Sequence, residues 1–234
     1  MKEKKIIAIQ QPEHLPWLGF FDKMKKCDQY IYLDSVQFKK RYFENRNKIR
    51  FDSESKWLTV PIMTKSKYHQ NINEVLIDNE QKWQRKYIDT IRHAYAKSNF
   101  LDAFYPDLTK IIETKYERLV DLNVAIIDWA RKLLEISTPV MMSSELKECK
   151  DKKGSDLILE ICIQLNADVY ISGPFGRDYL EHEKFKKADI EIEYHDYTHP
   201  VYKQLHEPFI SHLSFIDCLF CEGAEGVKAL IQNR

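Results

Sequence analysis

The segment from Gln10 to Gly19, with the sequence QQPEHLPWLG, concentrates side chains that can bind a polar substrate. It joins a short apolar run to a helical pattern. In a parallel sheet, ligands bind at the carboxyl ends of strands, and the N-termini of helices favour anions. The alternative is a turn stiffened by its prolines, with Trp17 in the core and His14 in solvent. We predict substrate contacts from four residues of this segment: Gln11, Pro12, His14 and Trp17.

A second segment, Asp34 to Lys48, follows the next predicted strand and would lie beside the first on the same sheet edge. Asp34 can remove a proton from an attacking amine, which must be neutral to act as a nucleophile. Arg46 has the forked guanidinium suited to phosphate or carboxylate. The alternative is a solvated basic loop. We predict Asp34 as a catalytic residue and the following as substrate-binding residues: Gln37, Asn45, Arg46, Asn47 and Lys48.

Two later segments also end predicted strands. In Tyr170 to Tyr179, a glycine allows close approach of the backbone to a ligand, although a plain turn explains the pattern equally well. In Tyr194 to Tyr202, His199 is a second candidate for the general base. We predict substrate contacts from the following: Ser172, Gly173, Tyr179 and Tyr202.

A metal site is not predicted. His195 and His199 are four residues apart, but they lie in a strand and turn pattern, and Pro200 argues against a helix there. Helical metal-pair geometry therefore does not apply, and further ligands are not evident.

The elements that must position these residues alternate between strand and helix. Apolar runs predict strands at 5–9, 29–34, 57–62, 73–77, 138–142, 168–172 and 190–194. Helical spacing of apolar residues predicts helices at 15–26, 155–165, 209–220 and 223–231. The pattern predicts an α/β fold: a mainly parallel twisted sheet flanked by helices and Rossmann-like. We expect one domain over residues 1–234, with a mostly helical layer at about 81–136 from the middle third of the chain.

Composition narrows the class of protein. Lys and Arg together number 36, as do Asp and Glu, which argues against a dedicated nucleic-acid binder. It leaves room for a local basic patch, and the segment from Phe38 to Arg50 is one. The opening apolar run is too short for a signal peptide, and a membrane span is not evident. Five scattered cysteines are typical of a reducing compartment, so we expect a cytoplasmic protein. Neither common glycine-rich nucleotide fingerprint is present.

The sequence resembles the WbqC-like family of bacterial surface-polysaccharide gene clusters. The resemblance lies in Ala8–Gly19, Leu33–Phe38, Asn45–Lys48, Trp57–Pro61, Tyr170–Gly173 with Tyr179, His199–Tyr202, Leu213–Asp217 and Gly223. It covers nearly the whole chain in order. At His14 the family more often has Tyr, which argues against His14 as an essential acid or base.

The resemblance implies a role in O-antigen or capsule assembly, with transfer of an acyl or aminoacyl unit, for example glycyl, to an amino sugar. A fainter similarity to adenylyl-transfer enzymes rests on His14–Trp17, which lacks the Gly and the second His of their HxGH signature. The first hypothesis is therefore an N-acyl- or N-aminoacyltransferase acting on a nucleotide-linked amino sugar.

The alternatives are an ATP-dependent, nucleotidyltransferase-like ligase and a non-catalytic sugar-nucleotide-binding protein. No resident cofactor is predicted, and ATP or an acyl or aminoacyl donor stays open as a co-substrate. An aminoacyl-tRNA donor and a homodimer also stay open.

Overall fold

The computed structural model describes residues 3–65 and 69–232 and divides the chain into two compact units. Each unit is assembled from three stretches that are separate in the sequence. Unit 1 comprises Met1–Pro12, Asp22–Val36 and Ser137–Thr198, and unit 2 comprises Glu13–Phe21, Gln37–Ile136 and His199–Arg234. Helix α1 (Leu18–Lys25) carries the boundary between two of these stretches. The interpretation of the chain as one domain stays a prediction.

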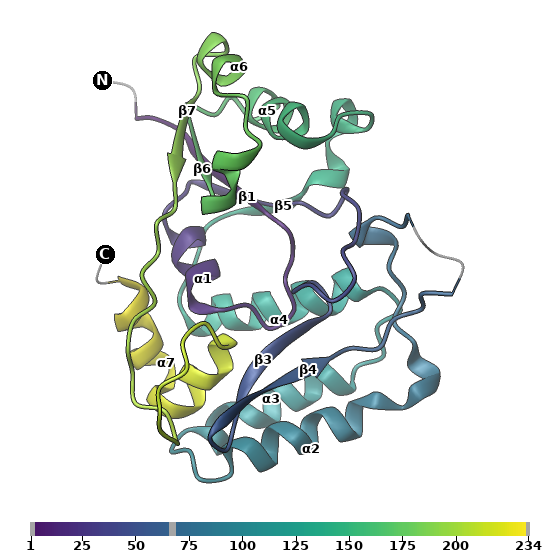
Figure 1. Cartoon of the computed structure of the whole chain (residues 1–234), viewed down its shortest axis with the longest axis vertical. Helices are drawn as coiled ribbons and strands as arrows, with labels where there is room; N and C mark the ends of the chain where they lie inside the picture. The colour runs from purple at the N-terminus through teal and green to yellow at the C-terminus, as the bar shows by residue number, and fades with distance from the viewer. Residues whose placement is uncertain (1–2, 66–68, 233–234) are drawn as a thin grey trace. The chain divides into compact units, whose positions relative to one another are not determined.

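Unit 1 is built on a five-stranded sheet in which every pairing is parallel (Figure 1). Its strand order is β5-β2-β1-β6-β7. The strands are β1 (Ile6–Gln10), β2 (Gln29–Tyr32), β5 (Val140–Met142), β6 (Val169–Ser172) and β7 (Glu191–Tyr194). Counted by chain order within the sheet, this is 3-2-1-4-5, the order of the Rossmann fold. The predicted α/β fold with a parallel sheet is therefore confirmed.

Helices flank this sheet. Helix α5 (Gly154–Gln164) and helix α6 (His182–Lys187) bring apolar side chains into one buried cluster with the sheet. Ile158 and Phe185 from these helices join Ile7 and Tyr170 from the strands. The central strand is buried along its middle, as expected for a parallel sheet covered on both faces. A short, continuous apolar run is thus enough to make β1 the centre of the unit.

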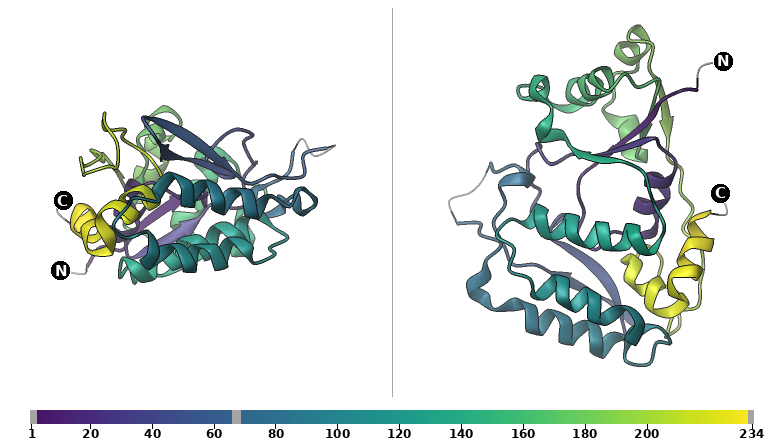
Figure 2. Two further views of the ribbon diagram at one scale, coloured as in Figure 1. Left: turned by 90° about the horizontal axis from the view of Figure 1, so that it is seen from below. Right: turned by 180° about the vertical axis from the view of Figure 1, so that it is seen from behind.

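Unit 2 combines helices with a two-stranded antiparallel hairpin. The hairpin consists of β3 (Arg46–Phe51) and β4 (Glu54–Thr59). Figures 1 and 2 show α2 (Trp83–Tyr95), α3 (Leu101–Glu113) and α4 (Leu119–Leu133) running side by side within this unit. Helix α7 (Phe215–Gln232) completes it. The long segment between β2 and β5 therefore stands where a Rossmann fold has a simple crossover helix.

Three sequence-based element predictions need correction. The predicted strand at 73–77 is wrong, because Ile72–Glu74 forms a short 3-10 helix in which the Glu74 carboxylate accepts from the Asn71 amide at 2.7 Å. The predicted strand at 57–62 lies earlier, as β4, and pairs with β3 in the hairpin rather than with the five-stranded sheet. Strand β3 itself was expected to be part of a basic loop, since its charged residues mask the alternation.

The ends of two helices also differ from the prediction. Helix α1 begins at Leu18 rather than at Leu15, because Leu15 has a positive φ of 43° and cannot continue a right-handed helix. Helix α7 merges two helical stretches across a kink at Gly223, where φ is 73° and ψ is 176°. The two predicted closing helices meet at this kink.

Replacing Gly223 by Ala tests the kink. This backbone conformation is nearly exclusive to glycine, and an added Cβ would lie 2.9 Å from a ring atom of Phe100. We expect Gly223→Ala to lower the free energy of unfolding by about 1–3 kcal/mol, measured by urea denaturation. Gly173→Ala is the matched control, since its Cβ would meet nothing within 4 Å and its φ is not positive. Equal stability of the two variants would contradict the strain at the kink.

Candidate functional site

The carboxyl edge of the sheet in unit 1 gathers residues from distant parts of the sequence. Gln11 follows β1, Asp34 follows β2, Gly173 follows β6 and His195 follows β7. The strand order reverses direction between β1 and β6, and ligands of open α/β sheets bind at such a switch point. The sequence predicts that Gln11 and Asp34 lie beside each other on this edge. The amide of Leu33 donates to the carbonyl of Gln10 at 2.8 Å, which joins the ends of those two strands.

A buried lysine, Lys23, contacts the end of β1. The Lys23 ammonium donates to the carbonyl of Ile9 at 3.1 Å and to the Gln10 side-chain oxygen at 3.4 Å. The hydroxyl of Tyr30 donates to the same Gln10 oxygen at 3.3 Å. These contacts hold the end of β1, and with it the following Gln11 and Pro12, in one orientation.

Asp34 is 2% exposed, and its carboxylate is engaged by two serines. One oxygen accepts from the Ser143 hydroxyl and from the Ser144 amide, both at 2.9 Å, and the other accepts from the Ser144 hydroxyl at 2.6 Å. Ser143 and Ser144 begin directly after β5. These contacts favour a positioning role for Asp34, which ties the carboxyl ends of β2 and β5 together.

His195 was not selected from the sequence, although it belongs to the segment that was considered. Its Nε2 lies 2.5 Å from the Asp22 carboxylate, and its backbone amide donates to the carbonyl of Ser172 at 2.8 Å. Asp22 is fully buried and also pairs with the Lys26 ammonium at 2.8 Å. Burial acts to raise the pKa of the Asp22 carboxyl, but the hydrogen bonds from His195 and Lys26 outweigh it and hold the pKa below its usual value.

This pairing has the geometry of a carboxylate that orients an imidazole. With Nε2 directed at Asp22, Nδ1 is the nitrogen left to exchange a proton with a ligand. The ring of Tyr197 stacks on the imidazole at 5.7 Å and 22° and limits its rotation. The partners are 173 positions apart in the sequence, and local spacing gives no signal for such a pair.

The third predicted segment surrounds the end of β6. Ser172 is buried, and its hydroxyl donates to the carbonyl of Gly173 at 3.1 Å. Gly173 has open space at its Cα, and Tyr179 is 48% exposed. An open backbone position next to the switch point agrees with the predicted close approach of a ligand, which stays a prediction.

His14 lies in unit 2 and is fully buried. Its Nδ1 pairs with the Asn123 side-chain oxygen at 2.9 Å and its Nε2 with the Tyr87 hydroxyl at 2.6 Å. Burial lowers the pKa of His14 to about 4, although the hydrogen bond with Asn123 opposes this shift. Because both ring nitrogens are bonded inside the protein, the contacts favour a structural role over the predicted contact with substrate.

The two asparagines on either side of Arg46 are also buried in unit 2. The Asn47 amide group donates to the carbonyl of Leu15 at 2.8 Å, and the Asn45 amide group donates to the carbonyl of Val60 at 3.0 Å. Gln37 is exposed and forms an isolated β-bridge with Asn71. The asparagines therefore fix the chain around β3, and their predicted role as ligand contacts stays untested.

Arg46 and Lys48 lie on the outer face of the hairpin with Trp57. The Arg46 guanidinium lies 4.1 Å from the centre of the Trp57 ring, and the Lys48 ammonium lies 5.1 Å from it. Trp57 is directly opposite Lys48 in the register of the hairpin. Both cations are half-buried and keep a side that faces solvent, as the predicted binding of an anion requires.

The remaining predicted residues form an aromatic cluster in unit 2. The Trp17 ring stacks with the imidazole of His212 at 5.1 Å and lies nearly parallel to that of His199 at 6.3 Å. The centres of the His199 and His212 rings are 4.9 Å apart. Tyr202 is buried, and its hydroxyl donates to the Asp217 carboxylate at 2.6 Å. The cluster brings Trp17 and His199 together, but their predicted roles in substrate binding and catalysis stay predictions. The Tyr202 hydroxyl is bonded to Asp217.

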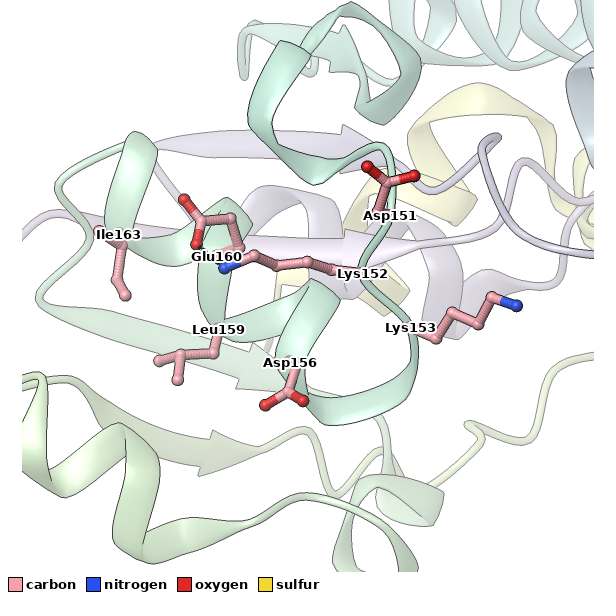
Figure 3. A pocket seen from close by; sticks show the side chains of 7 residues that line it. All are labelled: Asp151, Lys152, Lys153, Asp156, Leu159, Glu160 and Ile163. Carbon is pink, nitrogen blue, oxygen red and sulfur yellow. Dashed lines mark hydrogen bonds and ion pairs between the residues drawn. The ribbon is translucent and has the colours of Figure 1, made fainter.

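Figure 3 shows a pocket of about 430 Å³ at the start of α5 in unit 1. Its lining residues are Asp151, Lys152, Lys153, Asp156, Leu159, Glu160 and Ile163. Lys152 pairs with Glu160, and Asp156 pairs with Lys184 at 2.7 Å. Within each of these exposed pairs, the positive and negative charges offset each other. None of the predicted site residues lines the pocket.

Residues 3–65 and 69–232 contain no group of three or more His, Cys, Asp or Glu arranged to hold a metal ion. Within the same residues, no helix is long and apolar enough to cross a membrane.

Comparison with known proteins gives the family of this chain. The profile of the WbqC-like protein family matches residues 11–229. The chain belongs to the WbqC-like protein family. Uncharacterized protein Rv1507c of Mycobacterium tuberculosis (strain ATCC 25618 / H37Rv) is 32% identical over 222 residues, which cover 94% of this chain and 95% of that protein. No solved structure matches significantly. Membership of the WbqC-like family supports a role in polysaccharide biosynthesis.

Glu44 is a further residue of this family member that the sequence did not single out. It is fully buried, and neither carboxylate oxygen has a hydrogen-bond partner in the described part of the chain. Burial raises the pKa of Glu44 to about 7, while its own backbone amide and the charge of Lys39 oppose the shift. A carboxyl without partners is more stable in its neutral form.

This shift predicts a pH-dependent stability. The pKa of the carboxyl is about 4.5 in the unfolded chain and about 7 in the folded one. Glu44 therefore destabilises the fold increasingly as pH rises between these values. We expect Glu44→Gln to gain up to about 3 kcal/mol relative to the natural protein between pH 4 and pH 8, measured by urea denaturation. The difference in unfolding free energy between the variant and the natural protein is compared at the two pH values, so any effect of the introduced side-chain amide that does not depend on pH cancels. A difference that does not change with pH would contradict the assignment.

Proposed function

We propose that the protein is a transferase of polysaccharide biosynthesis that N-acylates or N-aminoacylates a nucleotide-linked amino sugar. The observation that carries the proposal is the Asp22–His195 pair at the carboxyl edge of a Rossmann-like sheet. Family membership supports the pathway. The strand order supports binding of a nucleotide near the switch point, between the loops that begin at Gln11 and Gly173.

In the proposed reaction, the sugar amine attacks the carbonyl carbon of an activated acyl group. The amine must first give up a proton, and Nδ1 of His195 accepts it. The Asp22 carboxylate stabilises the imidazolium that forms. A new N–C bond closes, the bond between the acyl carbon and its carrier breaks, and the proton passes from the imidazolium to the departing carrier.

Other residues have supporting roles in this proposal. Gln11 orients the polar substrate, and the backbone at Gly173 allows the nucleotide to approach closely. The predicted binding of an anion by Arg46 and Lys48 belongs to unit 2 and stays a separate prediction. Asp34 fixes the strand ends through its serine contacts, and we assign the general base to His195 in place of Asp34 or His199.

A reaction assay tests this proposal. The full chain is incubated with amino sugar nucleotides, such as 4-amino-4,6-dideoxyhexose derivatives, and with acyl and aminoacyl donors, in the presence and absence of ATP. Modification of the sugar is read by mass spectrometry. Pyrophosphate release would instead identify a ligase, and tight binding without turnover would identify a non-catalytic carrier. Either result would overturn the transferase proposal.

Substitutions then locate the base. We expect His195→Gln to lower kcat by roughly 100- to 10,000-fold, the usual contribution of general base catalysis. Asp22→Asn should lower kcat less, because the imidazole remains but a neutral amide no longer orients it and no longer stabilises the imidazolium. An Asp34→Asn variant with a larger loss than His195→Gln would return the role of base to Asp34.

The matched control is His182→Gln. His182 is another histidine of unit 1, and it pairs with the Tyr194 hydroxyl at 2.9 Å on the exposed surface of α6. We expect its kcat to equal that of the natural protein. Melting temperatures of all variants separate loss of chemistry from loss of fold.

A further inference from the structure

A partly exposed surface of unit 2 brings cations and aromatic rings together. We call it the basic–aromatic surface, and its residues are Lys39, Tyr42, Phe43, Arg46, Lys48 and Trp57. Tyr42 is 39% exposed and Trp57 is 37% exposed, which is unusual for such large rings. The neighbouring Lys40 and Arg41 are exposed as well. Within a chain of zero net charge, this is a local concentration of positive charge.

The rings of this surface form a row. The centres of the Tyr42 and Phe43 rings are 5.2 Å apart, and those of Phe43 and Trp57 are 5.9 Å apart. The Lys39 ammonium lies 5.5 Å from the Tyr42 ring at one end of the row. At the other end, Arg46 and Lys48 lie over Trp57. Each end of the row therefore presents a π-system beside a cation.

The surface is held in place before any ligand binds. The Arg46 guanidinium donates to the carbonyl of Arg41 while it stacks on Trp57, so it ties the turn at 39–42 to the hairpin. The amide of His14 donates to the carbonyl of Phe43 at 2.9 Å and anchors the next residues. A pre-organised surface loses less entropy when it binds.

Two carboxyl groups lie close enough to influence Tyr42, those of Glu13 and Glu44. Glu13 is half-buried, whereas Glu44 is fully buried. Burial raises the pKa of Glu44 to about 7, so this carboxyl is largely neutral below that pH. The charge that the surface presents to solvent is therefore mainly positive.

We propose that the basic–aromatic surface binds single-stranded nucleic acid. A single strand offers one flat base and one negative phosphate per nucleotide, and proteins that bind it combine stacking rings with cations. The surface offers three contacting rings with cations at both ends. A nucleoside diphosphate would occupy one ring and two cations and leave the rest unused, and a duplex would not expose the faces of its bases to the rings.

The binding proposal stands on the hairpin and its turn alone. Its link to the reaction rests on the proposed function: the donor is then an aminoacyl ester at the terminal ribose of an RNA strand. The sugar amine forms the new amide bond, the ester C–O bond breaks, and the ribose hydroxyl leaves with the proton that the amine gave up. The bound strand would supply the activated acyl group without a separate nucleotide triphosphate.

Fluorescence anisotropy tests the binding. The probe is a labelled, mixed-sequence RNA strand of roughly ten nucleotides, titrated with the full chain at several salt concentrations. We expect log K to fall as log salt rises, with a slope of about −0.7 for each phosphate contact. Trp57→Ala should weaken binding by roughly tenfold or more, and Trp57→Phe should retain most of it, because the stacking face remains. Arg46→Ala should reduce the size of the salt slope by about 0.7.

Lys56→Ala is the matched control. Lys56 lies 4.1 Å from the Phe51 ring on the same hairpin, so the variant removes the same kind of cation–ring contact. In the hairpin register, Lys56 pairs with Ile49 and belongs to the opposite face from Lys48 and Trp57. We expect its affinity for the RNA to equal that of the natural protein.

Three outcomes would overturn the proposal: no binding at low salt, equal binding by Trp57→Ala and the natural protein, or tighter binding of an acidic polysaccharide than of RNA. The last result would assign the surface to an anionic glycan. The assay measures binding and not transfer, so RNA binding without sugar modification would leave this inference standing while the proposed function failed.

Discussion

The parallel pairing of β1 with β2 and β6 is the constraint on which the site of unit 1 depends. Parallel strands end at the same edge, so residues from position 11 to position 195 are gathered there without being near in sequence. The hydrogen bond from the His195 amide to the Ser172 carbonyl continues the pairing of β6 and β7 by one residue. That extra step fixes the backbone of His195, and Asp22 then fixes its ring.

Polar side chains in unit 2 serve a different need. A buried carbonyl or amide without a partner is costly, so an irregular chain segment requires side chains that bond to it. Asn47 meets this need for Leu15, and Asn123 donates to the carbonyl of Glu44 at 2.7 Å while it also holds His14. The same residue types that bind substrates elsewhere here hold the path of the main chain, and residue type alone does not distinguish the two uses.

Because residue type does not distinguish these two uses, the sequence predicted the fold better than the roles of its polar residues. Alternating apolar runs and helical spacing were sufficient for the α/β fold and its parallel sheet, because burial of strands leaves a local pattern. The hairpin strand Arg46–Phe51 was not predicted, because charged residues on its outer face interrupt that pattern. The apolar runs at 5–9, 29–34 and 168–172 end within two residues of the ends of β1, β2 and β6. The Asp22–His195 pair and the isolation of Glu44 depend on contacts between distant segments, for which a single sequence carries no periodic signal.

The assembly of each unit from three separate stretches governs how the chain can be made and handled. The sheet of unit 1 is complete only after residue 194 has been synthesised. Strands β1 and β2 therefore leave the ribosome before all of 37–136 and before the other strands of their sheet. No single cut releases either unit as a continuous fragment. Removing or transplanting one unit in a gene therefore requires cuts and rejoining at several separate places.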